Sequence, residues 1–479
     1  MNRDVSVDAM EQIISMHFSE QSDFRARRMS LGEKECIVCY LDTLIDPMHV
    51  QEYILKPLLN RPLDAIRQVV SILDYSETDQ LEEAAQAILY GKAVLYREGE
   101  SHFYLLGADL KKERSINIPS NERVLRGANE AFIENIDTNL NLMRKLINST
   151  DFIVKTFMIG RLSKTKVAVM YIRSLAKPNI IEELERRLNS MDIDYVEMPG
   201  FIDEWIRESK YSLFPQMLIT ERPDRARAYL MEGKVVVTAA GSPDVIIVPV
   251  SFWSFFQSPE DYQNSWLLGT IFRLLRMICF VITIGLPAFY VSVSSFNPQL
   301  LPINFVNTLQ SSLKFVAFPP VIEALSMMLL LEILREATVR LASPVGQTIG
   351  VVGGIVIGTV VVQSNLVSNT MVIVAALTGL ASFIIPSYEM SNAVRQLCYP
   401  AILVSSIIGL FGLACFFMML CIHLCRMSSM GLPYFVPPFT LSESKDTLIR
   451  APIWKLDKRP QGTAPNNRTR LRNPRGWNR

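Results

Sequence analysis

Residues 266–293 read WLLGTIFRLLRMICFVITIGLPAFYVSV, and this stretch decides the fold class of the C-terminal half. The run from Met277 to Val293 is uncharged, and with the flanking residues from Trp266 to Leu274 it reaches the roughly 20 residues that a bilayer crossing needs. Arg273 and Arg276 precede the uncharged run, and positive charge is retained on the cytoplasmic side of a membrane. We therefore expect a membrane-spanning helix here, with the preceding part of the chain in the cytoplasm.

Hydrophobicity changes sharply along the 479 residues, whose formal net charge is +1. Up to about Gln263 charged and apolar residues are mixed as in a soluble protein, whereas from Trp266 to His423 charges almost vanish. The first 16 residues lack the basic start and apolar run of a secretory signal. Further candidate spans are Val345 to Val362, Met371 to Ile385 and Tyr399 to His423. The pattern predicts an α/β soluble N-terminal half followed by an α-helical polytopic membrane domain.

The segment from Phe315 to Leu334 does not fit a simple span. Pro319 and Pro320 interrupt its start, and an acidic residue such as Glu323 at mid-membrane costs about 2.5–3.5 kcal/mol on insertion scales. A re-entrant or interfacial helix and a true span both stay open. Four spans without it would return the basic C-terminal residues to the cytoplasm, and we expect that topology.

The composition also predicts the domain boundaries. We expect an N-terminal extension at 1–30, a first α/β subdomain at 31–125, a connecting segment at 126–150, a second α/β subdomain at 151–262, a transmembrane domain at 263–426 with about four spans plus a re-entrant or interfacial helix at 315–340, and a basic, largely disordered tail at 427–479. The tail is rich in Arg, Pro and Asn, a composition that resists folding and attracts anionic lipid.

The soluble half carries one order of elements twice. An apolar strand, two helices and a hairpin follow one another between Glu35 and Leu106, and the same order returns between Lys166 and Val250. Gly91 and Gly233 stand at matching places, where a helix needs a left-handed residue before a strand. We predict two related subdomains.

Nothing in the sequence supports an enzyme. Cys36 and Cys39 form a C-x-x-C, but in a strand this spacing turns the two side chains to opposite faces. The four histidines are scattered and have no Ser, Cys or Asp partner in a recognisable motif. We expect no catalytic residue, no cofactor, no metal site and no nucleic-acid partner.

A ridge of glycines runs along the second candidate span. Glycines recur there every four residues, at Gly346, Gly350, Gly354 and Gly358. Such a ridge lets helices touch backbone to backbone, either inside one subunit or between copies of the chain. In the second case the other face would line a pore, with a ring of apolar residues that blocks ions by dewetting. The candidate pore-lining residues are Thr348, Val352, Ile355 and Thr359.

Three motifs give the chain a family resemblance. FPPVIEA at 318–324, EILREA at 332–337 and GQTIGVVGG at 346–354 resemble the signature of the GerA family of spore germination proteins. The resemblance covers about residues 31–452. Four charged residues match motif positions and are candidate buried membrane charges: Glu323, Glu332, Arg335 and Glu336. Thr359 stands where Gln is common in the family.

The resemblance implies the A subunit of a nutrient germinant receptor in the inner membrane of a bacterial spore. Implied partners are a permease-like B subunit that senses the germinant, a lipoprotein C subunit, membrane lipid and further copies of the same chain in a ring, a pentamer in this family. Such a ring opens as an ion channel and triggers germination. An accessory spore membrane protein that supports dipicolinate or ion release or transport is the alternative, and a membrane protein whose soluble half does chemistry is a third.

Overall fold

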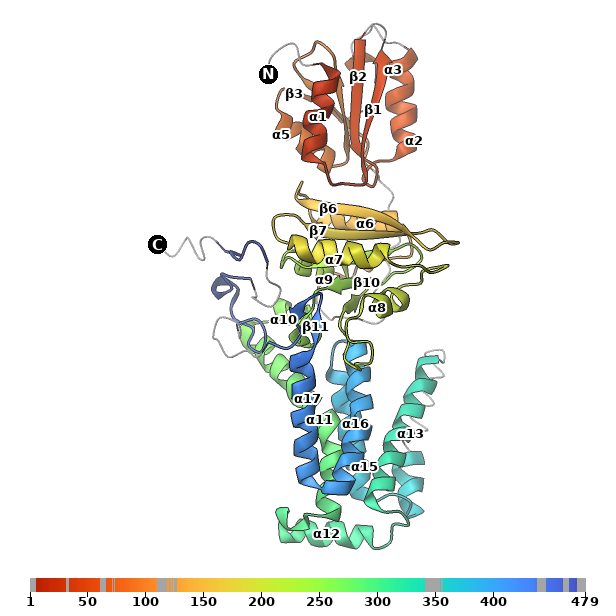
Figure 1. Ribbon diagram of the computed structural model, residues 1–479, viewed down its shortest axis with the longest axis vertical. Coiled ribbons are helices and arrows are strands. Elements are labelled where there is room, and N and C mark those ends of the chain that lie inside the picture. Colours follow the sequence, from red (N-terminus) through yellow and green to blue (C-terminus); the bar gives the residue numbers. More distant parts are fainter. Residues whose placement is uncertain are drawn as a thin grey trace. The chain divides into compact units, whose positions relative to one another are not determined.

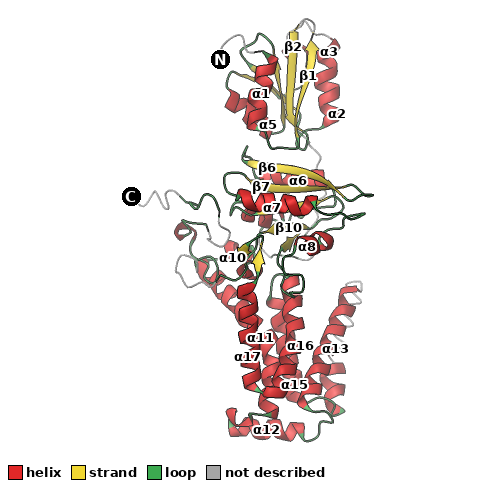
Figure 2. Cartoon of the chain, in the orientation of Figure 1, coloured by secondary structure: helices red, strands yellow, loops and turns green. Residues whose placement is uncertain are grey.

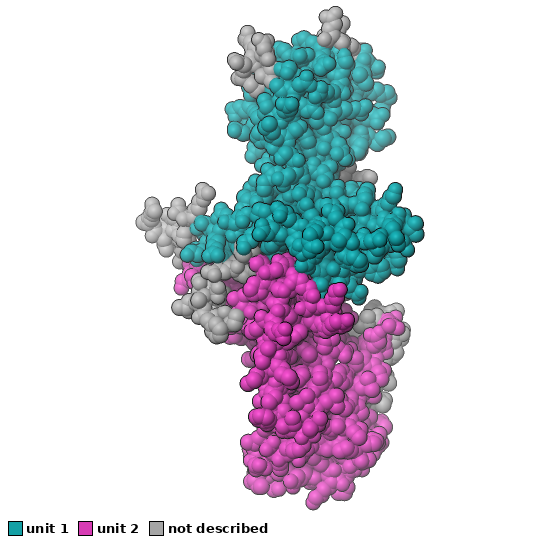
Figure 3. All heavy atoms as spheres, in the orientation of Figure 1, with its two compact units in different colours: residues 1–207, 219–249, 457–472 teal, residues 208–218, 250–456, 473–479 magenta. Residues whose placement is uncertain are grey.

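The computed structural model describes residues 6–31, 34–60, 66–70, 72, 74–109, 119, 122, 124, 127–340, 354, 356–436, 445–459 and 465–471. The chain divides into two compact units (Figure 3). The first comprises residues 1–207, 219–249 and 457–472, and the second comprises residues 208–218, 250–456 and 473–479. The first contains the two five-stranded sheets, and the second is mainly helical.

The first unit repeats one arrangement of helices and strands. The first copy contains α1 (Val7–His17), β1 (Phe24–Leu31), β2 (Lys34–Leu41), a continuous helical stretch of α2 (Pro47–His49), η1 (Val50–Leu55) and α3 (Lys56–Asn60), then α4 (Ile66–Val69), β3 (Tyr75–Thr78), α5 (Leu81–Leu89), β4 (Lys92–Arg97) and β5 (Phe103–Gly107). The second contains α6 (Ile136–Leu146), β6 (Phe152–Ile159), β7 (Thr165–Ile172), α7 (Pro178–Asn189), α8 (Gly200–Ile206), β8 (Leu218–Thr220), α9 (Pro223–Leu230), β9 (Val235–Ala239) and β10 (Val245–Val248). The strand orders, β1-β2-β4-β5-β3 and β6-β7-β9-β10-β8, are the same. The predicted internal repeat is confirmed.

Helices cover both faces of the first sheet (Figure 1). On one face Ile14 of α1 and Ile88 of α5 pack against Cys39, and on the other Ile54 of η1 packs in the cluster that contains Cys36. The two cysteines therefore point to opposite faces, as the spacing predicts. Strand pairings in this sheet are antiparallel, so the first subdomain is a layered structure of helices on an antiparallel sheet (Figure 2).

Both predicted glycine turns are present. Gly91 has φ +80° and Gly233 has φ +88°, in the left-handed region that favours glycine. A Cβ at Gly233 would also lie 2.8 Å from the carbonyl oxygen of Leu175. Each glycine lies in the turn between a helix and the central strand that follows it.

Two predicted boundaries in the first unit are wrong. The expected extension at 1–30 is wrong for its described part, because α1 buries Val7, Met10 and Ile14 and β1 pairs along its whole length with β2. Residues 126–150 are not merely a connection, because α6 occupies in the second copy the place that α1 has in the first. Each copy therefore begins one helix and one strand earlier than the hydrophobic pattern indicates.

The turn between β9 and β10 places a carboxyl group in an unfavourable setting. Burial, together with the charges of Glu221 and Glu122, raises the pKa of Asp244 to about 6 from its ordinary value near 3.8. The folded state binds the Asp244 proton more tightly than the unfolded state does. The resulting contribution to the free energy of unfolding is therefore fully present below about pH 4 and is lost as the pH rises through about 6.

We expect Asp244→Asn, which is neutral at every pH, to raise the thermal unfolding midpoint of the first unit at pH 7.5. The free energy of unfolding should rise by at most about 2–3 kcal/mol, and this increase should disappear at pH 4. The matched control is Asp192→Asn, because the Asp192 side chain is 76% exposed. Equal effects of the two substitutions, or an Asp244→Asn effect that does not change with pH, would contradict this expectation.

The second unit is built from helices. Its elements are η2 (Phe252–Phe256), α10 (Glu260–Gln263), α11 (Trp266–Ser295), η3 (Pro298–Leu300), α12 (Ile303–Leu313), α13 (Pro320–Arg340), the π-helical turn η4 (Val356–Val361), α15 (Asn369–Ile384), α16 (Tyr388–Ile408), α17 (Leu410–Arg426), the short hairpin β11 (Ser428–Ser429) and β12 (Leu432–Pro433), and η5 (Ile453–Lys455). In Figure 1, α11, α16 and α17 run alongside one another. Among the described residues α11 is long and apolar enough to cross a membrane, with a mean hydropathy of 2.0, and α15 and α17 are shorter apolar helices.

The helices of this unit alternate in direction. The end of α11 meets the start of α13, where the Tyr290 hydroxyl lies 3.0 Å from a Glu323 carboxyl oxygen, and Glu323 also contacts Ser368 at the start of α15. The start of α16 meets the end of α15, because the Ser391 hydroxyl donates to the Ser382 carbonyl oxygen at 2.7 Å. α13 and α15 thus run opposite to α11 and α16.

The expected single span from Tyr399 to His423 is wrong. The chain forms two helices, α16 and α17, and turns at Gly409, which has φ +65°. A Cβ there would lie 3.2 Å from Phe296 at the end of α11, so both the backbone conformation and the close approach favour glycine at this reversal of the chain. Most of the segment 315–340, expected as a re-entrant or interfacial helix, forms α13, an uninterrupted helix of 21 residues and about 31 Å long.

Candidate functional sites in the helical unit

A buried carboxyl group joins three helices. Glu323, in the first turn of α13, is completely buried. Its Oε1 accepts a hydrogen bond from the Ser368 amide at 2.6 Å, and its Oε2 accepts one from the Tyr290 hydroxyl at 3.0 Å. The Tyr290 and Ser368 hydroxyl groups are also 3.0 Å apart. Ser368 caps α15 by accepting from the Met371 amide, so this junction ties α11, α13 and the start of α15 together.

A second charged contact joins α13 and α16. Glu332 accepts from Arg395 at 3.0 Å, and Arg395 also donates to the Ser391 hydroxyl at 3.0 Å. Arg395 is 8% exposed, and its guanidinium is held by partners on two helices. A polar side chain at this position of α16 is therefore accommodated inside the helical bundle.

The other two predicted charges behave differently. The Arg335 guanidinium lies 4.9 Å from the centre of the Phe383 ring of α15, a cation–π contact. Glu336 pairs with Arg340 one turn further along the same helix, and its side chain is 61% exposed. The prediction that Glu336 is buried is thus wrong for the single chain, and the four charges form separate contacts rather than one site.

The glycine ridge is described only at its end. Gly346, Gly350, Thr348, Val352 and Ile355 lie outside the described residues. At both Gly354 and Gly358 an added Cβ would meet nothing within 4 Å, and Thr359 and Val360 are exposed. The described residues therefore leave room for a side chain at both positions.

The turn after this helix is anchored at its base. The Leu366 amide donates to the Val361 carbonyl oxygen at 3.2 Å, and the Asn365 carbonyl oxygen accepts from the Ala317 amide at 3.1 Å. The next anchor is the Ser368 amide on Glu323. The helix that carries the exposed glycines is therefore connected directly to the carboxyl junction.

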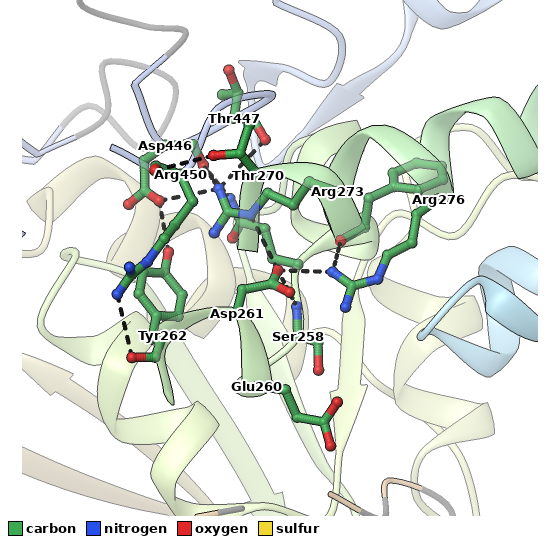
Figure 4. Close-up of polar contacts among 12 residues, drawn as sticks. Ser258, Glu260, Asp261, Tyr262, Thr270, Arg273, Arg276, Asp446, Thr447 and Arg450 are labelled. Atoms are coloured by element: carbon green, nitrogen blue, oxygen red, sulfur yellow. Dashed lines mark hydrogen bonds and ion pairs between the residues drawn. The ribbon is translucent and has the colours of Figure 1, made fainter. Parts of the chain in front are cut away.

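A buried cluster of charges at the start of α11 was not predicted from the sequence. Figure 4 shows Arg273 and Arg276 converging on Asp261, which is completely buried. Asp261 Oδ2 accepts from Arg273 Nε at 3.1 Å, from Arg276 Nη1 at 2.8 Å and from the Ser258 amide at 3.2 Å. The two arginines that the sequence presents as flanking positive charges are thus neutralised inside the protein.

The C-terminal segment completes this cluster. Arg273 Nη1 donates to the backbone oxygen of Asp446 at 2.7 Å and lies 3.2 Å from its carboxylate, which also accepts from the Tyr262 hydroxyl at 2.7 Å. Arg450 packs over the Tyr262 ring, with its guanidinium carbon 5.5 Å from the ring centre. Residues 445–456 are therefore fastened to the start of α11, and the expectation of a largely disordered tail is wrong for this part of it.

No group of three or more His, Cys, Asp or Glu residues that could hold a metal ion occurs within the described parts of the chain. The contacts above are structural junctions between helices. What they can do chemically is hold the helices in one arrangement and transmit a displacement of one helix to another.

A family model described as "Bacillus/Clostridium GerA spore germination protein" matches residues 12–462. The chain is 38% identical over 419 residues to spore germination protein A1 of Bacillus subtilis, which covers 86% of this chain and 87% of that protein. It is 32% identical over 462 residues to spore germination protein KA of the same organism, with 94% and 85% covered. It is 35% identical over 449 residues to the uncharacterized membrane protein YfkQ of Bacillus subtilis, with 92% and 88% covered.

Among solved structures, the crystal structure of the N-terminal domain of the A subunit of the Bacillus megaterium spore germinant receptor GerK3 matches 52% of this chain and 96% of its own. The sequence identity is 23% and the TM-score is 0.40.

Proposed function

The chain belongs to the GerA family of spore germination proteins, and as an A subunit of a germinant receptor we propose that it forms an oligomeric ion channel in the spore membrane. Copies of the chain surround an axis, and the glycine-bearing helix lines or borders the ion path. Opening follows when a partner subunit senses the germinant. This chain contributes the pore, and germinant specificity is carried by the partner.

One observation carries this proposal. Gly354 and Gly358 have open space where a side chain would be, and Thr359 and Val360 beside them are exposed. In lipid, small residues on an uncovered helix face favour close approach of another helix. A second copy of this chain is the simplest source of that helix, because most oligomers consist of one kind of chain and have closed symmetry.

The arrangement of helices supports several membrane crossings. α13 and α15 run opposite to α11 and α16, and the helix ending near residue 363 precedes the anchored turn before α15. We propose six crossings, with α12 lying along the membrane surface. An even number agrees with the hydrogen bond of 2.8 Å between the Phe252 amide and the Tyr434 carbonyl oxygen, which brings the segments before α11 and after α17 to one end.

The proposal predicts self-association through the glycine face. In a background in which the exposed Cys421 and Cys425 are replaced by Ser, Gly358→Cys should form a disulfide-linked dimer of full-length chains in membranes. Ile407→Cys is the control, because Ile407 is 74% exposed on α16. Equal or absent cross-linking at both positions would show that the glycine face is not the contact between copies.

Ion flux tests the pore itself. Liposomes or cells that hold this chain with its B and C partner subunits are compared with the same system carrying Thr359→Gln or Ile355→Ala. We expect a severalfold change in resting leak or in the germinant response, because Thr359 is exposed beside the glycines. An unchanged flux in both variants would contradict the pore assignment, and flux that needs no germinant would favour the accessory role in ion or dipicolinate release.

A further inference from the structure

A loop from the sheet-containing part of the sequence belongs to the helical unit. Residues 208–218 cluster with α11 to α17, while the residues on either side of the loop belong to the first unit. Glu208 Oε1 accepts from the Gly431 amide at 2.8 Å, and the Ser212 hydroxyl lies 2.9 Å from His423 Nε2. The loop is therefore fastened to the last turn of α17 and to the hairpin that follows it.

Hydrogen bonds within the loop fix its shape. The Gln216 side-chain oxygen accepts from the amides of Glu208 and Ser209, both at 3.0 Å, and its side-chain nitrogen donates to the Ser209 carbonyl oxygen at 2.8 Å. Phe214 is 1% exposed, and its ring centre lies 6.1 Å from that of His423. The side chains that the loop presents outward are thus held in place.

Two apolar side chains leave this rigid loop on its outer side. Tyr211 is fully exposed and Leu213 is 54% exposed, whereas Ser212 and Phe214 between and after them are buried. Lys210 beside Tyr211 is also exposed. Tyr211 and Leu213 thus expose apolar surface on a loop whose shape is fixed by hydrogen bonds.

The last turns of α17, next to the residues that hold the loop, also expose side chains. Ile422 is 55% exposed, and Cys425 and Arg426 are exposed as well. Within residues 208–218 and 418–426, all of which the structure describes, the single acidic residue is Glu208, and its carboxylate is engaged by the hairpin. The exposed charges of this surface, Lys210 and Arg426, are therefore both positive.

We propose that residues 208–218 form an anchor in the headgroup region of an anionic bilayer. Tyr211 and Leu213 enter the interface at the end of α17, and Lys210 and Arg426 lie at the level of the lipid phosphates. Tyrosine favours the membrane–water interface, and long basic side chains extend from it toward the headgroups. The positive charge and the continuity with the exposed apolar side of α17 select lipid as the occupant. The inference rests on the proposed membrane location of α17.

The anchor gives the first unit a separate connection to the membrane. The sequence leaves that unit at residue 207, passes through the anchored loop and returns at residue 219, before it leaves again at residue 249 for α11. The second subdomain is thus tethered through the loop as well as through the start of the bundle.

Lipid-quenching fluorescence tests the anchor. Tyr211→Cys is labelled with an environment-sensitive fluorophore in the full chain, with Cys415, Cys421 and Cys425 replaced by Ser, and the protein is placed in phosphatidylglycerol nanodiscs that contain headgroup-spin-labelled lipid. We expect at least twofold stronger quenching than at Leu162→Cys, an aqueous reference in the first unit, where Leu162 is 81% exposed. Lys210→Glu with Arg426→Glu should reduce the quenching at residue 211 in phosphatidylglycerol and change it little in phosphatidylcholine.

The reference position Ile373→Cys separates this inference from the proposed function, because Ile373 is 61% exposed on α15. Acyl-chain quenching at residue 373, with residue 211 no more quenched than residue 162, would overturn the anchor and leave the membrane assignment intact. Absence of lipid quenching at both 373 and 211 would overturn the membrane assignment itself. Protection of residue 211 from aqueous iodide without lipid quenching would show that another protein chain covers the loop, and this too would overturn the anchor.

Discussion

Asp261→Asn is expected to destabilise the helical unit by roughly 3–5 kcal/mol, the usual effect of removing one member of a buried ion pair. Asp261 is completely buried between two arginines, and its Oδ2 lies 2.8 Å from Arg276 and 3.1 Å from Arg273. Asn keeps the shape of the side chain but removes its charge. Both guanidinium groups would then stay buried without the negative charge of Asp261 beside them. Asp446 would be the remaining acidic partner of Arg273.

The effect should appear first in the C-terminal segment. Residues 445–456 are attached to α11 mainly through Asp446 and Arg450, so hydrogen exchange of their backbone amides should become roughly 100-fold faster or more. The thermal unfolding midpoint of the full chain in detergent should fall in parallel. The matched control is Glu260→Gln, because the Glu260 side chain points away from the three guanidinium groups in Figure 4. Exchange in residues 445–456 that is the same in both variants would contradict the role assigned to Asp261.

The repeat in the first unit could be predicted from short-range signals, and its limits could not. Gly91 and Gly233 mark the same helix-to-strand turn in both copies, and the central strands are continuous apolar runs. The hydrophobic pattern does not indicate β1, because β1 is an outer strand with the sequence FRARRMSL, whose charged residues are largely exposed. An outer strand of a sheet needs few apolar residues, so its sequence resembles that of a loop.

The sequence does not indicate the first helix of the second copy either, for a different reason. α6 buries polar residues, among them Asn139 and Arg144, and such residues weaken the apolar periodicity that predicts a helix. Arg144 is 2% exposed and donates to Asp23 at 2.7 Å. Its partner lies 121 residues earlier, so no local pattern shows that the charge is satisfied.

The helical unit shows the same limit. α11 is predicted well because its apolar run is long, whereas the first half of α16 contains Glu389, Asn392 and Arg395 and was left out of the expected span. The structure accommodates Arg395 through Glu332, 63 residues away. Likewise Arg273 and Arg276 indicate only a membrane boundary in the sequence, because Asp446 is far along the chain. Charges inside a bundle are recognisable from sequence only when their partners are local.

Glu323→Ala is expected to have the second largest effect, on both stability and gating. Hydrogen bonds to a charged group contribute about 1.5–3 kcal/mol, and the substitution leaves the Tyr290 hydroxyl and the Ser368 amide without this acceptor. The turn before α15 would lose one of its anchors, while the contact between Asn365 and Ala317 would remain. We expect faster hydrogen exchange in residues 364–370 and a germinant response that is strongly reduced or replaced by a resting leak.

A graded series distinguishes loss of the junction from general damage to α13. Glu323→Gln keeps an acceptor and should have a smaller effect than Glu323→Ala, and Tyr290→Phe removes a single hydroxyl and should cost about 0.5–1.5 kcal/mol. Because the two residues touch, the double variant should be less damaging than the sum, with a coupling energy of about 0.5–3 kcal/mol. Glu336→Gln is the control on the same helix, since its side chain is 61% exposed and its pairing with Arg340 contributes little. If Glu323→Ala changes flux no more than Glu336→Gln does, the carboxyl junction does not transmit motion to the glycine-bearing helix, and the pore must be controlled elsewhere in the bundle.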